Sequence, residues 1–515
     1  MRSIQARQSF TRTTLIAALA GVASLGVSSC GGAPDAVEVV SGAIVAQQTY
    51  LVSFAGGDIP SNADSIVAAA GGSIVTRYQN VGAVLAKGSS ALVAALRADA
   101  RVDAVASAKA VSSALGPVRP ASGAHPPLRN GQPGADPLSN RQWDMKQIRA
   151  PQARAISAGK PSVLVGIFDS GLDVTHPDLV GQVVSSASAS CVGGVANPDP
   201  AVWSNDVFGH GTHVAGIIAG ARNGVGIVGV APGVKVAGVK VIVDDLNDPN
   251  AGLIFADAFV CAIDWAIGHD FDLMNASLLI DPFTGPIDDI FCSNDPDRLA
   301  VIKMVRRAVI AAAAHDISLI AAAGNTFTDL TALAHSMPGA TCSVLPVGAP
   351  TVIGVSAVGV TRQLSFYSNY GRGAIDLTAP GGDSLIPDPA VTDTAASGQV
   401  LSSMPPNSLF YQAAAGYDGQ VQDCSSGTCA TYGYLQGTSQ AAPHVTGVAA
   451  LAISRFGKMG PLALRLLLSA TATPLPCPAG PYDPGMTGTP ATCSGPARFN
   501  NFYGAGEVDA LNVVR

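Results

Sequence analysis

The chain beyond residue 140 alternates continuous apolar runs with segments of helical spacing. Four apolar runs have the length of strands, at Ser162–Asp169, Gly233–Val243, Leu319–Gly324 and Val352–Val358. Between them, the apolar residues of Leu253–Gly268 and Leu299–Ala314 are spaced as in helices. Strands that are apolar throughout are typical of a parallel sheet with helices on both faces. The pattern therefore predicts an α/β domain with a mostly parallel sheet.

A shorter pattern in residues 45–112 predicts a small α+β module. The expected order is strand, helix, strand, strand, helix, strand, at Thr49–Phe54, Ser65–Ala70, Ser73–Tyr78, Val81–Ala86, Ser90–Ala98 and Val102–Ala106. This βαββαβ order is ferredoxin-like. The following residues, Pro117–Pro137, are rich in Pro, Gly and Ala, which indicates a linker open to proteolysis.

The first thirty residues have the pattern of an export signal. A basic start is followed by the apolar run Leu15–Val27, which is shorter than the roughly 20 residues that span a bilayer. Val27-Ser-Ser-Cys30 resembles a bacterial lipoprotein cleavage site, with Cys30 as the lipidated first residue of the mature chain. An ordinary secretory peptide that is cut nearby is the alternative. Gly31 after Cys30 favours the outer membrane if the source is Gram-negative.

Composition narrows the function classes. The 515 residues include 29 Lys and Arg against 36 Asp and Glu, a formal net charge of −7. Charged residues make up 13% and hydrophobic residues 48%, which excludes a largely disordered chain. Without a basic excess to neutralise phosphates, the chain is not expected to bind nucleic acid.

The nine cysteines fit an exported chain. If Cys30 is lipidated, eight remain, and an even number is typical of disulfides in exported proteins. Cys424–Cys429 and Cys477–Cys493 are the expected pairs, because their members are close in sequence. Four others allow three pairings that spacing does not separate: Cys191, Cys261, Cys292 and Cys342. Buried free thiols are the alternative.

Four Gly-rich junctions beside apolar segments carry chemical groups. They place an acid, an imidazole, an amide and a hydroxyl in the order Asp169, His210, Asn325 and Ser439. Each has a plainer interpretation when it is taken alone. His210 and His213 could form part of a metal site, Asn325 could close a turn, and Ser439 could cap a helix.

The four motifs together resemble the subtilisin-like serine proteases, from about Trp143 to the end of the chain. The resemblance implies a three-layer subtilisin-like fold and an Asp-His-Ser triad. Ser439 would be the nucleophile and His210 the general base, which Asp169 would orient. The Asn325 amide and the Ser439 backbone N–H would bind the oxyanion.

The resemblance also assigns substrate-binding residues. The family's substrate-pairing strand and oxyanion strand correspond to Ser277, Leu278, Leu279, Ala323 and Gly324. Leu279 stands where the family usually has Gly, so we expect a narrowed pocket and cleavage after small or medium apolar residues. Gln440 replaces a Met that is usual in the family, which predicts activity that survives peroxide. The segment Asp383–Gln436 is longer than usual, and it either borders the cleft or forms a solvated loop.

A calcium site is implied by the same resemblance. Asp178 matches the family's carboxylate ligand, and the calcium loop corresponds to Ala221, Asn223, Val225 and Ile227. Carboxylate, amide and carbonyl oxygens are the ligands that calcium prefers. A bare surface turn is the alternative.

These expectations divide the chain into five parts. They are a signal peptide (1–29), a tether (30–44), an inhibitory propeptide (45–112), a linker with an autoprocessing site (113–139) and a catalytic domain (140–515). The hypothesis is an exported serine endopeptidase zymogen, anchored by lipid at the outer membrane or cell surface and released by cleavage. Its partners would be polypeptide substrates and its own propeptide. A surface-tethered binding protein with an inactive protease fold, or a hydrolase of another ester or amide, is the alternative.

Overall fold

The apolar runs assemble into one parallel sheet. The computed structural model describes residues 48–108, 111–113, 136–244, 252–280, 292–336, 341–386, 398–409, 420–425, 427, 429–486 and 488–515. The strand order is β16-β15-β13-β11-β6-β8-β7, and every pairing in the sheet is parallel. The strands are β6 (Leu164–Asp169), β7 (Ala189–Ser190), β8 (Lys235–Lys240), β11 (Leu273–Ala276), β13 (Ser318–Ala322), β15 (Ile353–Val358) and β16 (Leu377–Pro380). The predicted α/β sheet is confirmed.

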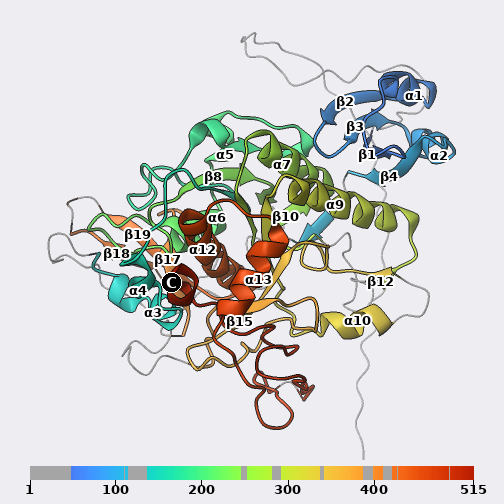
Figure 1. Cartoon of the computed structure of the whole chain (residues 1–515). Coiled ribbons are helices and arrows are strands. Elements are labelled where there is room, and N and C mark those ends of the chain that lie inside the picture. The colour runs from blue at the N-terminus through green and yellow to red at the C-terminus, as the bar shows by residue number, and fades with distance from the viewer. Residues whose placement is uncertain are drawn as a thin grey trace, which may run out of the picture. The chain divides into compact units, whose positions relative to one another are not determined.

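Helices cover both faces of this sheet (Figure 1). On one face, α6 (His210–Ala219) and α12 (Thr438–Phe456) share a core with strand residues such as Ile167. On the other face, α7 (Ala256–Gly268) and α9 (Pro296–Ala314) share a core with Phe168. Neighbouring strand residues point to opposite faces, so each strand contributes to both cores. The other helices of this domain among the described residues are α3 (Trp143–Gln147), α4 (Ala150–Arg154), α5 (Pro200–Trp203), α10 (Leu330–Ser336), α13 (Pro461–Thr471) and α14 (Ala510–Val514), with 3-10 turns η1 (Ser139–Arg141), η2 (Ser185–Ala187) and η3 (Val192–Gly194).

One predicted helix starts later than its pattern indicates. Residues Leu253–Phe255 lie in β10 (Gly252–Phe255), and the helix begins at Ala256. β10 pairs antiparallel with β9 (Ile242–Asp244) and with β5 (Val111–Ser113). Hydrogen bonding to strands on both sides outweighs the local helical spacing.

Two further small sheets complete the α/β domain. β17 (Val400–Ser403), β19 (Ala430–Leu435) and β18 (Gln420–Asp423) form an antiparallel sheet. The Ser402 hydroxyl donates to the carbonyl of His213 in α6 at 2.7 Å. The three strands of the Asp383–Gln436 segment therefore form a mostly buried sheet packed on α6, whereas Gly427 and Cys429, in the turn that the Cys424–Cys429 disulfide closes, are exposed. The backbones of β12 (Cys292–Ser293) and β14 (Thr341–Cys342) also pair, with Cys292 opposite Cys342.

Residues 48–108, here called the N-terminal module, have the expected βαββαβ order. The elements are β1 (Gln48–Phe54), α1 (Ala63–Ala69), β2 (Ser73–Tyr78), β3 (Ala83–Gly88), α2 (Ser90–Arg97) and β4 (Val102–Ser107). The antiparallel sheet has the order β2-β3-β1-β4. One face of it packs on α1 and α2, through Val52 and Ile66 among others. The opposite face, with Leu51 and Leu85, joins the core of α7 and α9.

Three disulfides join cysteines whose side chains the structure describes. Cys424–Cys429 and Cys477–Cys493 confirm the two pairs expected from spacing. Cys191–Cys261 is the third, and it links the residue before η3 to α7. Cys30 lies outside the described residues. In the part of the chain that the structure describes, no helix has both the length and the apolarity to cross a membrane.

Candidate active site

The four residues singled out by the sequence lie at one edge of the parallel sheet. Asp169 ends β6, and Asn325 follows β13. His210 begins α6, and Ser439 lies in the first turn of α12, which packs against α6. The carboxyl ends of parallel strands meet at one edge, which is where α/β proteins place their functional groups.

His210 and Asp169 form a buried hydrogen-bonded pair. His210 Nδ1 lies 2.8 Å from Asp169 Oδ1, and neither side chain is exposed. The Ser170 backbone N–H donates to the same carboxylate oxygen at 2.8 Å. His210 Nε2 is buried and has no hydrogen-bond partner among the described residues. The carboxylate thus holds the ring so that Nε2 remains available to accept a proton.

Asp206 supports this pair, although sequence reasoning missed it. Its carboxylate accepts hydrogen bonds from Ser170 Oγ at 2.7 Å and from the backbone N–H of Thr212 at 2.8 Å. It also accepts from the Gly209 N–H at 2.9 Å. These bonds satisfy donors at the start of α6 and hold the turn that carries His210. An acid shortly before a helix start was the available signal.

Ser439 is hydrogen-bonded to Ser277, which the family resemblance assigns to substrate binding. Pro443 lacks an N–H, so the Ser439 carbonyl has no helical hydrogen bond from that position. The Ser277 hydroxyl donates to this carbonyl at 2.8 Å. Ser439 Oγ donates to the Ser277 carbonyl at 3.1 Å, and no hydrogen bond joins it to His210. Candidate catalytic hydrogen bonds are often long or poorly aligned before substrate binds, so the missing contact does not exclude Ser439 as a nucleophile.

Asn325 has one end of its amide fixed. Its Oδ1 accepts from both the backbone N–H and the hydroxyl of Thr438, each at 2.9 Å. Nδ2 is the remaining donor, and it lies 3.3 Å from the position a Cβ would take at Gly437. Thr438 therefore orients the amide, a role that sequence reasoning did not assign. A donor beside the nucleophile is the arrangement that stabilises an oxyanion.

The remaining residues that the resemblance assigns to substrate binding differ in burial and in hydrogen bonding. Leu278 is buried and Leu279 is half-buried. Leu279 Cδ1 would lie 2.9 Å from a Cβ on Gly324, so this side chain lies against the oxyanion strand. The Gly324 N–H donates to Thr438 Oγ1, and the Ala323 carbonyl accepts from the side chain of Asn369, each at 2.9 Å. These two backbone groups are engaged within the protein.

His213 is a structural imidazole. It is fully buried, and Nε2 lies 3.0 Å from the Gly433 carbonyl. Burial, with a smaller contribution from the nearby His210, lowers the pKa of His213 to about 3. The two histidines have different partners, and the described residues contain no group of three or more His, Cys, Asp or Glu that could hold a metal. The metal-site alternative for His210 and His213 has no support.

The loop assigned to calcium is closed by hydrogen bonds. Asp178 is buried, and its Oδ2 accepts from the Ile227 N–H at 3.3 Å. Its Oδ1 has no hydrogen-bond partner in the part of the chain that the structure describes, and burial raises the pKa of this carboxyl to about 8. The Ala221 N–H donates to the Asp178 carbonyl at 2.9 Å, and Asn223 Oδ1 accepts from the Val225 N–H at 2.9 Å. The unpaired buried carboxylate oxygen fits a hard cation, whereas the Asn223 oxygen is turned into its own loop.

Comparison with known proteins extends this picture. A family model described as the subtilase family matches residues 160–506. Fervidolysin from Fervidobacterium pennivorans is 31% identical over 65% of this chain. The matched part spans 41% of the length of fervidolysin. Subtilisin DY from Bacillus licheniformis is 30% identical over 64% of this chain and 90% of its own length. The crystal structure of fervidolysin, titled a keratinolytic enzyme related to subtilisin, has a TM-score of 0.60 at 25% identity. The structural match covers 93% of this chain and 62% of the fervidolysin chain.

Proposed function

Because the chain belongs to the subtilase family, we propose that it is a serine endopeptidase that acts through an acyl-enzyme. The observation that carries the proposal is the buried His210–Asp169 pair, whose free Nε2 lies at the sheet edge where α12 presents Ser439. A serine hydroxyl is a weak nucleophile until a base removes its proton. The site supplies that base, its orienting carboxylate and an oxyanion donor.

Each group has one role in the proposed reaction. Ser439 Oγ attacks the peptide carbonyl while its proton passes to His210 Nε2. The carbonyl electrons move to oxygen, where Asn325 Nδ2 and the Ser439 N–H donate hydrogen bonds. His210 then gives its proton to the leaving amine as the C–N bond breaks. Water attacks the acyl-enzyme in the same way, and Asp169 holds the His210 ring in place throughout.

The alternatives are separable by labelling and digestion. An inactive, binding-only protein lacks one of the reacting groups, whereas Asp169, His210, Asn325 and Ser439 are all present here. A hydrolase of another ester would react with a fluorophosphonate probe but would leave casein intact. We expect both labelling and casein digestion.

We further propose that the N-terminal module is an inhibitory propeptide that occupies the protease in cis. Beyond the module, β5 pairs antiparallel with β10, with Ser113 opposite Leu253. β10 pairs with β9, and the residue before β9, Val241, donates its N–H to the Asp169 carbonyl at 2.9 Å. Ser113 therefore lies in the small sheet that also contains β9, and this sheet adjoins Asp169 through Val241, which supports an autoprocessing site within residues 113–139.

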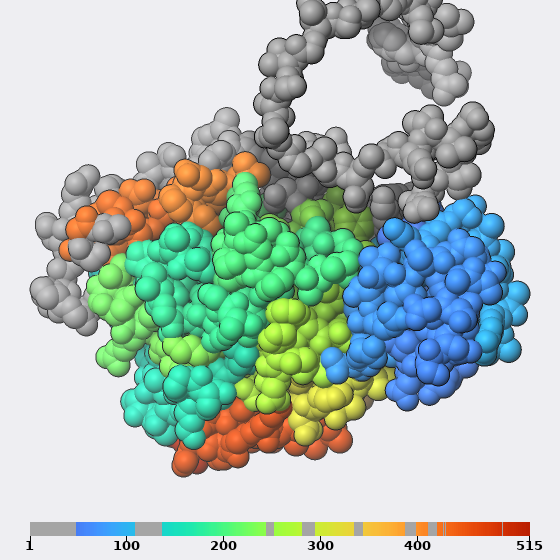
Figure 2. Space-filling view, turned by 90° about the horizontal axis from the view of Figure 1, so that it is seen from above, coloured from blue at the N-terminus to red at the C-terminus, as the bar shows by residue number. Residues whose placement is uncertain are grey.

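The docking surface of the module supports the same proposal. Figure 2 shows the blue module directly against the yellow-green and yellow part of the α/β domain. On α7, Asp264 Oδ1 accepts from the backbone N–H groups of Asn80 at 2.8 Å and Val81 at 3.3 Å. On α9, Arg307 donates to the carbonyls of Val81, at 2.7 Å, and Gly57. Main-chain recognition over an apolar contact suits a partner of fixed shape, such as a folded inhibitory module.

Processing of the chain tests both proposals. Residues 31–515 would be expressed as wild type and as Ser439→Ala, and the products sized and N-terminally sequenced. We expect the wild type to yield a species that begins within residues 114–139, and Ser439→Ala to stay full length. Two full-length products without casein digestion would contradict the activity. Active protease of full length would contradict only the propeptide proposal.

The calcium site is also proposed. Asp178, the Asn223 amide and the carbonyls of Ala221, Val225 and Ile227 would hold the ion, which would neutralise the buried carboxylate and stiffen the loop. A chelator should then lower the melting temperature of the wild type but not of Asp178→Asn. Equal melting temperatures with and without chelator in the wild type would favour a bare turn.

Specificity and location complete the proposal. Because Leu279 lies against Gly324, we expect cleavage after small or medium apolar residues. A peptide library should show this preference, and Leu279→Gly should extend it to large aromatic residues. We also propose export with a lipid on Cys30, which would tether the zymogen to the membrane until cleavage. Labelling with radioactive palmitate should mark the wild type and not Cys30→Ala.

A further inference from the structure

A cavity of about 230 Å³ lies beside α9 and has no role in the proposed chemistry. Its polar lining comes from Arg306 of α9, Arg372, Thr331 and Ser343. Among the described residues, no acidic side chain lines it. Two cationic groups without a carboxylate between them create a site of positive potential.

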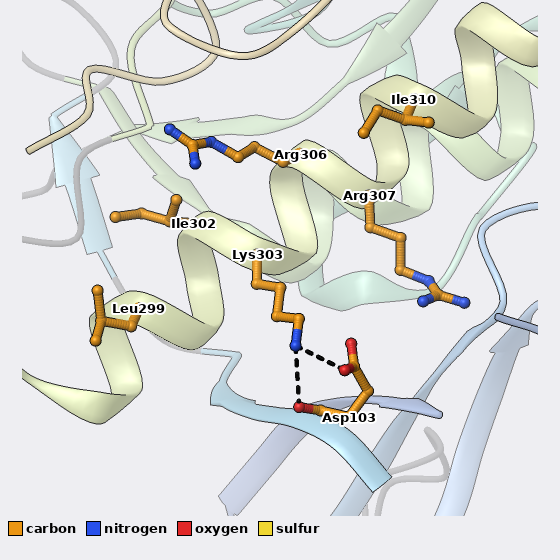
Figure 3. A pocket seen from close by; sticks show the side chains of 7 residues that line it. All are labelled: Asp103, Leu299, Ile302, Lys303, Arg306, Arg307 and Ile310. Carbon is orange, nitrogen blue, oxygen red and sulfur yellow. Dashed lines mark hydrogen bonds and ion pairs between the residues drawn. The ribbon is translucent and has the colours of Figure 1, made fainter. Parts of the chain in front are cut away.

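Arg306 lines this cavity and has hydrogen-bonding capacity that the described residues leave unused. It also lines a second cavity of about 450 Å³, in which Lys303 pairs with Asp103 of the module at 2.6 Å. Figure 3 shows the Arg306 guanidinium directed away from Asp103, whereas Lys303 reaches it. Arg306 Nε is buried without a partner in the described part of the chain. A long contact of 3.4 Å to Ser343 Oγ is the hydrogen bond that Arg306 makes there.

Arg372 approaches the cavity from another segment. Its guanidinium carbon lies 5.4 Å from the centre of the Phe499 ring, and it forms no ion pair with the described residues. Stacking on a ring leaves the edge N–H groups of a guanidinium free to donate. The two arginines can therefore share one anionic group.

The other described lining residues are apolar side chains and glycines. Leu330, Val344 and Val347 are buried, and Ala374 completes this side. A bare inorganic anion would gain nothing from these side chains, whereas an alkyl chain would be removed from water. The cavity volume suits a group of a few carbon atoms.

We propose that this cavity binds a small carboxylate with a short apolar chain. Guanidinium groups bind carboxylates through parallel, charge-assisted N–H···O bonds. Arg306 and Arg372 would hold the carboxylate, Ser343 would add a hydroxyl, and the apolar side would cover the chain. A free short-chain acid and the C-terminal residue of a peptide share this chemistry. The proposal is independent of the peptidase activity.

Calorimetric titration of the full-length Ser439→Ala protein tests the site. The probes are hexanoate, N-acetyl-leucine, hexanamide and inorganic phosphate. We expect a carboxylate to bind at least tenfold more tightly than hexanamide or phosphate. Stronger binding of hexanoate would point to a free acid, and stronger binding of N-acetyl-leucine to a peptide end.

Variants locate the binding. Arg306→Gln and Arg372→Gln should each weaken the preferred carboxylate at least tenfold, and Lys303→Gln, the matched control on the same helix, should not. Because the two arginines lie on different segments, Arg372→Gln keeps the test open if Arg306→Gln fails to fold. Absence of binding, equal binding of hexanamide or phosphate, or unchanged affinity in an arginine variant would overturn the proposal.

Discussion

Two histidine–aspartate pairs are buried in the described part of the α/β domain, and they differ in what the second ring nitrogen does. His210 Nδ1 lies 2.8 Å from Asp169, and His444 Nε2 lies 2.9 Å from Asp144. All four side chains are fully buried. His444 Nδ1 is also bonded, to the carbonyl of Gln440 at 2.7 Å, whereas His210 Nε2 has no described partner.

The difference separates the proposed catalytic pair from a structural one. His444 has both ring nitrogens in hydrogen bonds within the protein, so neither nitrogen is available to a substrate. It ties α3, which carries Asp144, to the helix that carries Ser439. His210 has one nitrogen held and one free, as a general base requires. A short His–Asp distance therefore does not identify a catalytic pair, whereas a free nitrogen beside a nucleophile does.

The largest expected effect is that of Asp169→Asn. The amide keeps the shape of the carboxylate but favours the wrong tautomer of His210, so kcat should fall about 10,000-fold. The melting temperature should change little. Peptide anilide hydrolysis and thermal unfolding measure the two quantities. A loss of less than tenfold in kcat would remove Asp169 from the proposed triad.

The matching change in the other pair should act on stability. Asp144→Ala leaves His444 buried without its partner, so the free energy of unfolding should fall by about 3 kcal/mol. The folded fraction should keep kcat within tenfold of the wild type. Urea unfolding in a Ser439→Ala background, which prevents self-digestion, gives the first value. A 10,000-fold loss of kcat without a loss of stability would make the two pairs alike.

Local pattern and long-range geometry explain what the sequence could predict. Apolar runs predicted the sheet, and motif order predicted which groups meet at its edge, as for Asp169 and Ser439. The bond from Ser277 to the Ser439 carbonyl depends on how Pro443 interrupts α12 against a distant strand. Cys191–Cys261 closes 70 residues, and spacing could not choose it among three pairings. Leu253–Phe255 became a strand because neighbours outside its own segment pair with it.

His213 is a third buried histidine, and its Nε2 contacts the Gly433 carbonyl rather than a carboxylate. Its contribution to the free energy of unfolding should depend on pH. Its folded pKa of about 3 lies below the ordinary value of 6.5. The unfolded chain therefore gains a proton that the folded chain refuses as pH falls from about 6.5 towards 3. Its contribution to stability is complete above pH 6.5, and about 3 kcal/mol of it should be lost by pH 4.

His213→Gln keeps a neutral donor near the position of Nε2 but does not titrate. In the Ser439→Ala background, this variant should lose about 3 kcal/mol less stability than its parent between pH 7 and pH 4. Urea unfolding at the two pH values measures the difference. Parallel losses in both proteins would show that His213 already protonates in the folded state.

The smallest expected effect concerns Gln440. Its carbonyl accepts a hydrogen bond from His444, and its neighbour Ser439 carries the hydroxyl proposed as the nucleophile. Its side chain is buried and contains no sulfur, so peroxide should leave most of the activity intact. Gln440→Met should lose activity under the same treatment. Met404 is the internal control, since its Sδ would lie 2.5 Å from a Cβ at Gly209, next to His210. If the wild type loses activity and Met404→Leu restores it, the oxidation-sensitive position lies beside His210 rather than Ser439.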